Sequence, residues 1–136
     1  MILEKVLTIK THVSFQLIDI TDDIERFVAE ANIKEGICLI YVPHATAALI
    51  LNEFESNLLE DILTMIKQLF PINRNWKHNT IDNNAHAHLA SAFLGTSKAL
   101  PISKGKLIRG TWQNIIFVEL DGPRSARRII IKIVGE

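Results

Sequence analysis

The chain has 136 residues, and 15 Lys and Arg balance 15 Asp and Glu, so its formal net charge at pH 7 is zero. This length suits a single domain over residues 1–136. A balanced charge disfavours nucleic acid and anionic membranes as partners, because their capture needs a field of one sign. Hydrophobic residues make up 48% and charged residues 22%, which excludes a disordered chain.

Targeting signals and cysteine content bear on the location of the protein. The N-terminus carries charge where a signal peptide has its apolar run, and no stretch approaches the roughly 18 apolar residues of a membrane span. The single cysteine, Cys38, excludes an internal disulfide framework, so we expect a cytoplasmic protein. Cys38 stands in an apolar run, which predicts an inert core thiol rather than a nucleophile.

The first part of the chain is predicted to form two strands and a helix. Apolar and polar residues alternate over 3–10 and 13–20, as in half-buried strands. Asp22 and Glu25 form a possible capping pair. The following helix ends near residue 32 and has its apolar residues at helical spacing, at Ile24, Phe27, Val28 and Ala31.

The middle of the chain is predicted to hold two extended segments, a helix and a long loop. The apolar run 37–42 predicts a buried strand, and 45–51 is a second extended segment. Apolar residues recur at helical spacing over 58–69, and Pro71 ends that helix. Residues 72–85 contain five asparagines and few apolar side chains, so they form a loop long enough to suggest a function.

The last part of the chain is predicted to be mostly strands. A short helix over 88–94 ends at Gly95. Strands follow at 97–102, 106–108 and 114–120, and in the C-terminal strand Ile129, Ile131 and Ile133 face one way. About eight short strands with two to three helices predict an α+β fold with a mostly antiparallel sheet.

Histidine placement gives the first indication of a site. Imidazole is a common ligand of zinc-like divalent ions, and three or four such groups, from among His44, His78, His86 and His88, can close a metal site. On a helix His86 would diverge from His88 by about 200°, so both serve one site only if the helix begins after His86. The alternative is that these histidines are loop and capping residues.

Polar residues flank the apolar stretch 45–51 at both ends. We predict His44 and Glu53 as catalytic residues at the rim of a cleft, with Glu53 as a general base. Thr46 and Asn52 are predicted to bind substrate. The alternative is a core strand whose polar ends lie in the adjoining loops.

The tetrapeptide GTWQ at 110–113 suits a polar or anionic ligand. Gly110 and Thr111 let backbone amides approach an anion, and the amide of Gln113, a predicted catalytic residue, can fix a polar substrate. Arg124 could hold a phosphate or carboxylate. The alternatives are a turn with a packed Trp112, and a solvated basic turn or a subunit ion pair at Arg124.

Several of these segments together resemble the YjbQ-like family. The family signature is similar to residues 97–115 (SKALPISKGKLIRGTWQNI). Its other landmarks are similar to PHATAA at 43–48, LNE at 51–53, WKH at 76–78 and NAHAH at 84–88. The resemblance runs from about Leu3 to the C-terminus.

This resemblance implies a YjbQ-like α+β fold that assembles as a homotrimer, with the histidines in a cleft near the subunit boundary. It also implies an activity, secondary thiamine-phosphate synthase, which joins hydroxymethylpyrimidine diphosphate to thiazole phosphate and releases pyrophosphate. The recurring histidines of the family match His44, His78 and His88, so the resemblance implies these three as the metal ligands.

The residue types suit two enzymatic mechanisms. A divalent ion on the histidines, with Zn²⁺ as the candidate, would activate water or polarise a phosphate oxygen, with Glu53 as the base. Alternatively, the ion and Arg124 would neutralise a leaving pyrophosphate. The alternative to an enzyme is a non-catalytic module that binds a small phosphorylated metabolite or a protein partner.

Overall fold

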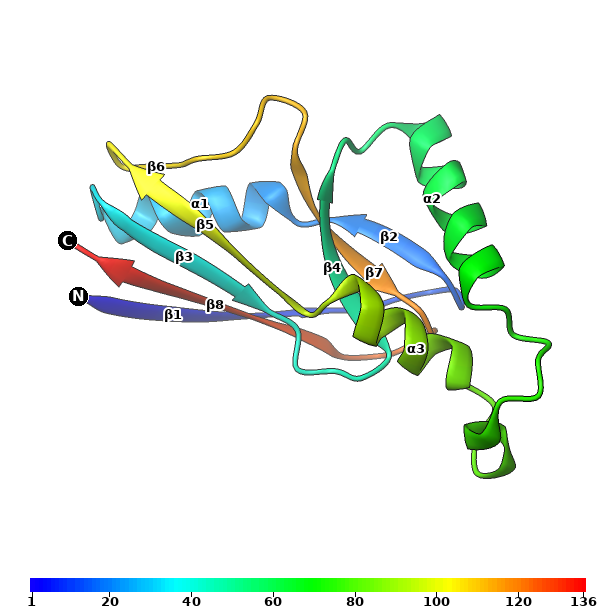
Figure 1. The fold of residues 1–136 in the computed structure, drawn as a ribbon. Coiled ribbons are helices and arrows are strands. Elements are labelled where there is room, and N and C mark those ends of the chain that lie inside the picture. The colour runs from blue at the N-terminus through cyan, green and yellow to red at the C-terminus, as the bar shows by residue number, and fades with distance from the viewer.

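The computed structural model describes residues 1–136, which form two antiparallel sheets and a set of helices (Figure 1). One sheet has five strands in the order β1-β8-β3-β5-β6, and the other has three in the order β2-β7-β4. Every strand pair is antiparallel. The predicted α+β fold with a mostly antiparallel sheet is confirmed.

The element bounds agree with most of the predicted segments. The five-stranded sheet contains β1 (Ile2–Ile9), β8 (Arg127–Gly135), β3 (Gly36–Tyr41), β5 (Ser97–Ser103) and β6 (Lys106–Leu107). The three-stranded sheet contains β2 (Gln16–Asp19), β7 (Asn114–Glu119) and β4 (Ala47–Asn52). The helices are α1 (Thr21–Ala31), α2 (Ser56–Leu69) and α3 (Ala85–Leu94), with a 3-10 helix η1 (Lys77–Thr80).

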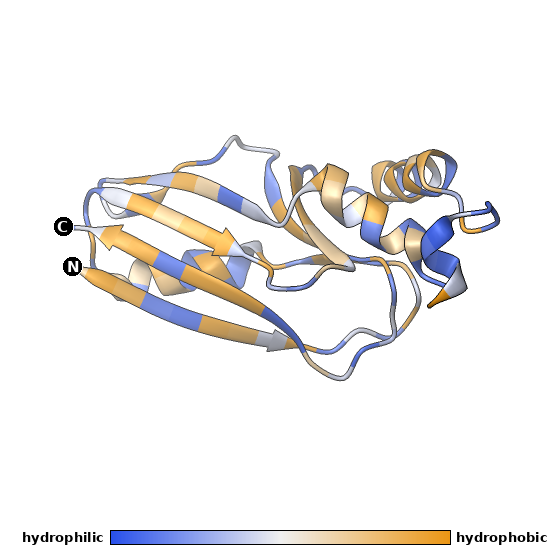
Figure 2. Ribbon diagram, turned by 60° about the horizontal axis from the view of Figure 1, so that its bottom comes forward, coloured by the Kyte–Doolittle hydropathy of each residue, from blue (hydrophilic) through white to orange (hydrophobic).

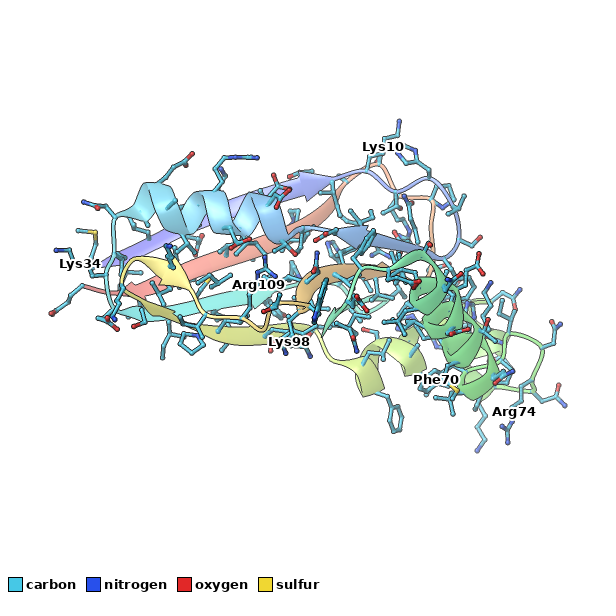
Figure 3. The ribbon with its side chains drawn as sticks, turned by 90° about the horizontal axis from the view of Figure 1, so that it is seen from above. Lys10, Lys34, Phe70, Arg74, Lys98 and Arg109 are labelled. Carbon is cyan, nitrogen blue, oxygen red and sulfur yellow. The ribbon has the colours of Figure 1, made fainter.

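The main core lies between α1 and one face of the five-stranded sheet, which Figure 3 shows from above. Ile24 and Val28 of α1 are buried there together with Ile129, Ile131 and Ile133 of β8. Full burial of one such aliphatic side chain contributes about 1.5–3 kcal/mol, so this layer is a main source of stability. None of the helices has the length and apolar character needed to cross a membrane.

The start of α1 differs from the prediction. Asp22 and Glu25 do not form a capping pair, and the residue that precedes the helix, Ile20, provides no side-chain cap. Instead Oδ1 of Asp19 accepts hydrogen bonds from the backbone N–H and the hydroxyl of Thr21, at 3.0 and 2.6 Å. The predicted pair is therefore wrong, because the carboxylate that binds the first turn comes from the end of β2.

Strand β3 is buried on one face only, and this corrects the prediction of a buried strand over 37–42. Cys38 and Ile40 are fully buried, whereas Ile37, Leu39 and Tyr41 are 57%, 40% and 41% exposed. Residues alternate between the two faces of a strand, and α1 covers one of those faces. Burial raises the pKa of Cys38 to about 11, so the predicted inert core thiol is confirmed.

Helix α3 begins at Ala85, before the predicted start at His88. His86 and His88 therefore both lie on the helix, where residues two apart point to different sides. The predicted loop 72–85 is confirmed except for the single 3-10 turn η1. The ring nitrogen of Trp76 in this loop donates a hydrogen bond to the carbonyl of Pro71, 2.8 Å away.

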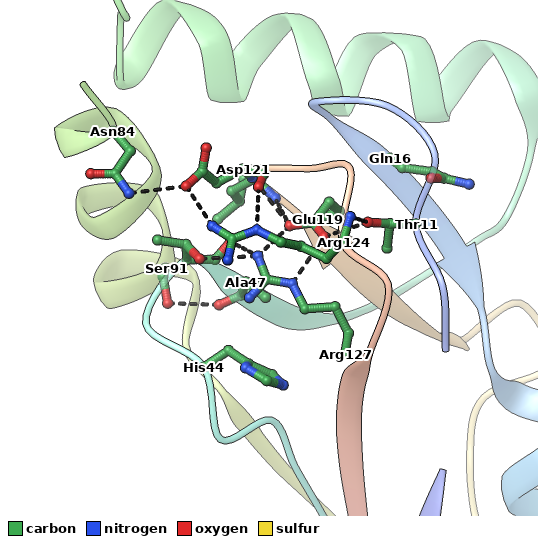
Figure 4. A network of polar contacts seen from close by, with 12 residues as sticks. Thr11, Gln16, His44, Ala47, Asn84, Ser91, Glu119, Asp121, Arg124 and Arg127 are labelled. Atoms are coloured by element: carbon green, nitrogen blue, oxygen red, sulfur yellow. Dashed lines mark hydrogen bonds and ion pairs between the residues drawn. The ribbon is translucent and has the colours of Figure 1, made fainter. Parts of the chain in front are cut away.

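A buried ion pair joins the end of β7 to the start of β8 (Figure 4). The side chains of Arg127 and Glu119 are 3% and 0% exposed. Oε1 of Glu119 accepts hydrogen bonds from Nε of Arg127 at 2.9 Å and from the hydroxyl of Thr11 at 2.7 Å. Burial alone would raise the pKa of Glu119, but the hydrogen bonds outweigh it and lower this pKa below its usual value.

We expect Arg127→Met to lower the free energy of unfolding by about 3–5 kcal/mol, because it leaves the Glu119 carboxylate buried without its partner. Urea unfolding at a fixed protein concentration measures this change. Arg26→Met is the control, since the Arg26–Asp23 pair is 62% and 47% exposed and such pairs contribute at most about 1 kcal/mol. Equal losses in the two variants would contradict the prediction.

Candidate functional site

The predicted site residues fall into two groups at opposite ends of the three-stranded sheet. Strands β4 and β7 pair so that Ala47 lies opposite Glu119 at one end and Asn52 lies opposite Asn114 at the other. At a rise of about 3.3 Å per residue, these ends are roughly 17 Å apart. The first end carries His44, Thr46, His78, His88 and Arg124, and the second end carries Asn52, Glu53, Gly110, Thr111 and Gln113.

The second group forms local contacts of its own. Oε1 of Gln113 accepts a hydrogen bond from the backbone N–H of Gly110 at 2.7 Å, which closes the turn 110–113. The preceding residue, Arg109, is labelled near the middle of the molecule in Figure 3. Trp112 is 70% exposed, so the turn does not pack it. The roles predicted for this group stay predictions. Within a single chain, Glu53 does not lie in one cleft with His44, because the two residues are at opposite ends of β4.

Two cavities at the first end meet at His88. One has a volume of about 450 Å³, lies between the β3–β4 connection and α3, and is lined by His44, His88 and Ser91 among others. The other has a volume of about 670 Å³ and is lined by His78, His88 and Trp76 among others. The ring centroids of His78 and His88 are 4.7 Å apart, with the rings edge to face. His88 thus lines one cavity with His44 and the other with His78, but neither cavity contains all three histidines.

The main chain of β8 fixes the imidazole of His44. The backbone N–H of Arg128 donates a hydrogen bond to Nε2 of His44, 2.8 Å away. A neutral imidazole that accepts at Nε2 carries its proton on Nδ1. Burial, with the guanidinium groups of Arg127 and Arg128, lowers the pKa of His44 below its usual value of 6.5. His44 is therefore neutral at pH 7 and is a hydrogen-bond donor through Nδ1.

The side chains of one chain do not fit the predicted three-histidine metal site. No group of three or more His, Cys, Asp and Glu side chains is placed to hold an ion. Nε2 of His44 already accepts the Arg128 N–H and its Nδ1 is protonated, so neither nitrogen has a free lone pair. His78 and His88 then remain as two ligands, whereas a catalytic zinc site takes three from the protein.

His86 is separate from the other histidines. It is 7% exposed, and its ring packs against Phe15 with the centroids 5.7 Å apart. Burial lowers the pKa of His86 below its usual value of 6.5. The start of α3 at Ala85 places His86 and His88 on different sides of the helix. His86 therefore does not line the cavities of His88.

Thr46 and Arg124, both predicted to bind substrate, make contacts within the chain, and Figure 4 shows those of Arg124. Thr46 is 6% exposed, and its hydroxyl oxygen accepts a hydrogen bond from Arg127 at 3.0 Å. Nη2 of Arg124 donates to Oδ2 of Asp121 at 2.8 Å, and the Asn84 amide donates to the same oxygen at 2.9 Å. These contacts stabilise the chain around His44, and the substrate-binding roles stay predictions.

The sequence reasoning missed two cations of the cavities, Arg74 and Lys77. Both line the 670 Å³ cavity, and both also line a third cavity of about 700 Å³ over the loop that precedes α3. The guanidinium carbon of Arg74 lies 4.9 Å from the ring centroid of Trp76. A signal was present, because the segment 72–81 (INRNWKHNTI) contains Arg, Lys and His but no acidic residue.

We expect His44 to titrate below pH 6.5 and to keep its proton on Nδ1 at pH 7, because of its burial and the Arg128 N–H. Long-range ¹H–¹⁵N NMR spectra of labelled protein distinguish the two ring nitrogens. His12 is exposed and serves as the reference within the same spectra. A protonated Nε2 on neutral His44 would contradict the assignment. The His44 contribution to stability is present above pH 6.5 and is lost as the pH falls through the lowered pKa.

Comparisons of sequence identify relatives along almost the whole chain. The family described as UPF0047 protein, YjbQ-like, matches residues 5–136. A UPF0047 protein of Archaeoglobus fulgidus is 48% identical over 126 residues, which cover 93% of this chain and 97% of that protein. The UPF0047 protein YugU of Bacillus subtilis is 38% identical over 135 residues, covering 96% and 98%.

Solved structures agree with these matches. The crystal structure of a YbjQ-like protein from Sulfolobus solfataricus P2 has a TM-score of 0.99 and 53% identity, and covers 100% of this chain and 99% of that chain. A hypothetical protein from Aeropyrum pernix K1 has a TM-score of 0.95 and 41% identity, covering 98% and 99%. The resemblance noted in the sequence is therefore confirmed, and the chain belongs to the UPF0047, YjbQ-like family.

Proposed function

We propose that the histidine end of the molecule binds a small phosphorylated metabolite. The observation that carries this proposal is the charge of its cavities. The three cavities are lined by Arg74, Lys77, His44, His78 and His88, and no Asp or Glu lines any of them. The chain has 15 acidic residues, but none of them lines these cavities, so the charged side chains of the lining are cations. A cavity lined in this way attracts anions.

The side chains around the cavities match the oxygens of a phosphate group. The guanidinium of Arg74 and the ammonium of Lys77 can donate charge-assisted hydrogen bonds to phosphate oxygens. Neutral His44 adds an N–H donor at the wall of the neighbouring cavity. A volume of about 670 Å³ also suits a small metabolite, since ligand sites measure roughly 300–1,000 Å³.

Lys77→Ala should raise the dissociation constant for pyrophosphate about tenfold, because a hydrogen bond to a charged group contributes roughly 1.5–3 kcal/mol. Isothermal titration calorimetry with pyrophosphate measures the change. Lys34→Ala is the matched control, because the exposed Lys34 lies at the other end of the molecule from Arg74 (Figure 3). Equal affinities in Lys77→Ala and Lys34→Ala, or no binding by the wild type, would contradict the proposal.

A second candidate function is the thiamine-phosphate synthase activity that the family resemblance implies. The observation that favours it is the contact between His78 and His88, because imidazoles at a cavity wall can act as general acids and bases. In this reaction the bond from the pyrimidine methylene carbon to the diphosphate breaks, the thiazole nitrogen bonds to that carbon, and pyrophosphate leaves. Arg74 and Lys77 would stabilise the leaving anion. The predicted divalent ion would need ligands besides His78 and His88, and elemental analysis of untagged protein tests it.

Turnover separates the enzyme from a binding module. The wild type, given hydroxymethylpyrimidine diphosphate and thiazole phosphate, should release pyrophosphate, detected by an assay coupled to an inorganic pyrophosphatase. His88→Gln should lower the rate at least about 100-fold, the usual loss for a general acid or base. The exposed His12 provides the control His12→Gln, which should retain the wild-type rate. Binding of pyrophosphate without turnover by the wild type would leave the non-catalytic module as the function.

A further inference from the structure

The cavity of about 700 Å³ over the loop between α2 and α3 is lined mainly by uncharged polar side chains. Figure 2 shows this loop mostly in the colour of hydrophilic residues. Thr80 contributes a hydroxyl to the lining, and no acidic residue belongs to it. We call this the asparagine cavity after the four amides that line it, which are those of Asn73, Asn75, Asn79 and Asn83.

Most of these amides are available to a ligand. The amide of Asn79 is partly engaged, because its Oδ1 accepts the backbone N–H of Ala85 at 3.1 Å. Asn73, Asn75 and Asn83 are exposed, so their amides can reach a ligand in the cavity. A primary amide offers one acceptor oxygen and two N–H donors, and a hydroxyl is both a donor and an acceptor. The asparagine cavity therefore suits an uncharged group that carries several hydroxyls.

The asparagine cavity shares a wall with the 670 Å³ cavity, because residues 74–77 line both. The two cations of the cavities, Arg74 and Lys77, belong to this shared wall. The ring of Trp76 between them is fixed by its hydrogen bond to the Pro71 carbonyl at 2.8 Å, and the guanidinium carbon of Arg74 lies 4.9 Å from its centroid. A phosphate bound to these cations is therefore held where the two cavities meet. The rest of its molecule then enters one cavity or the other.

The linings of the two cavities differ in polarity beyond the shared wall. In the 670 Å³ cavity the further lining consists of the imidazoles of His78 and His88 and the apolar side chains of Ala85 and Leu89. In the asparagine cavity it includes three asparagines and Thr80. A hydroxyl that leaves water without a new hydrogen-bond partner costs free energy, whereas amides replace the lost hydrogen bonds. The hydroxyl-bearing part of a ligand is therefore favoured in the asparagine cavity.

We propose that the phosphorylated metabolite is a sugar phosphate whose hydroxyl-bearing carbons lie in the asparagine cavity. Arg74 and Lys77 hold its phosphate at the shared wall, next to the cavity of His78 and His88. This proposal rests on the binding function proposed above and deepens it, because it names the class of metabolite and the direction in which the molecule lies.

Two phosphate esters with the same number of carbons test the preference for hydroxyls. Ribose 5-phosphate and pentyl phosphate carry the same charged group, but only the ribose has hydroxyls. Isothermal titration calorimetry should give a dissociation constant about tenfold lower for ribose 5-phosphate, which is the effect of one or two hydrogen bonds. Equal dissociation constants would overturn the proposal. Tighter binding of pentyl phosphate, or of phenyl phosphate as an aromatic probe, would also overturn it and indicate a ligand that enters the 670 Å³ cavity.

Substitutions in the asparagine cavity test where the sugar lies. Asn73 and Asn83 line this cavity and neither of the other two, and both are exposed. The Asn73→Leu, Asn83→Leu double variant should bind ribose 5-phosphate about tenfold more weakly and keep the wild-type affinity for pyrophosphate, because its cations are intact. Asn57→Leu is the matched control, since Asn57 is exposed on α2 and lines none of the cavities. A double variant with the wild-type affinity for ribose 5-phosphate would overturn the proposal.

Pyrophosphate distinguishes failure of this proposal from failure of the proposed function. It contains no carbon, so its binding tests the anion site alone. If the wild type binds pyrophosphate but does not distinguish ribose 5-phosphate from pentyl phosphate, the sugar assignment is wrong and the binding function stands. A wild type that binds neither pyrophosphate nor ribose 5-phosphate would overturn both.

Discussion

The histidine end of the molecule depends on the ion pair buried between Arg127 and Glu119. A charge left unpaired at this depth costs several kcal/mol, so the end of β7 and the start of β8 are stable only when these side chains meet. Arg127 also donates to the backbone carbonyl of Thr46, two residues after His44. The next residue, Arg128, then supplies the N–H that His44 accepts. The ion pair makes no hydrogen bond to His44, but it holds in place the two segments that position the His44 imidazole.

Most of the fold could be predicted from the sequence because each helix or strand buries one face. Its apolar residues therefore recur at the spacing of a helix or of a strand. Strand β8 and helix α2 follow that spacing closely, and their predicted positions are confirmed. The prediction was wrong where the spacing of apolar residues fits more than one structure. An apolar run such as 37–42 is equally compatible with a strand between two layers and with a strand whose second face is left to solvent. The start of α3 was also predicted wrongly, because its N-cap residue Asn84 makes no side-chain capping hydrogen bond.

The candidate site was harder to predict than the fold because its geometry comes from distant parts of the chain. The bond between His44 and Arg128 joins residues 84 positions apart, and no spacing rule indicates it. The neighbourhood of His78 and His88 depends on how the loop before α3 closes. The sequence analysis predicted polar residues at both ends of β4, but it placed Glu53 and His44 in one cleft and did not account for the length of the strand between them.

The hydrogen bond that fixes His44 comes from the backbone of residue 128 and not from its side chain. Every amino acid except proline supplies this N–H, so an exchange of Arg128 leaves the tautomer of His44 unchanged. The side chain at position 128 is exposed, so a substitution there can change the charge beside the cavity and still keep the N–H that His44 accepts. The tautomer of His44 is therefore set by the backbone of β8, whereas the charge at position 128 acts on its pKa.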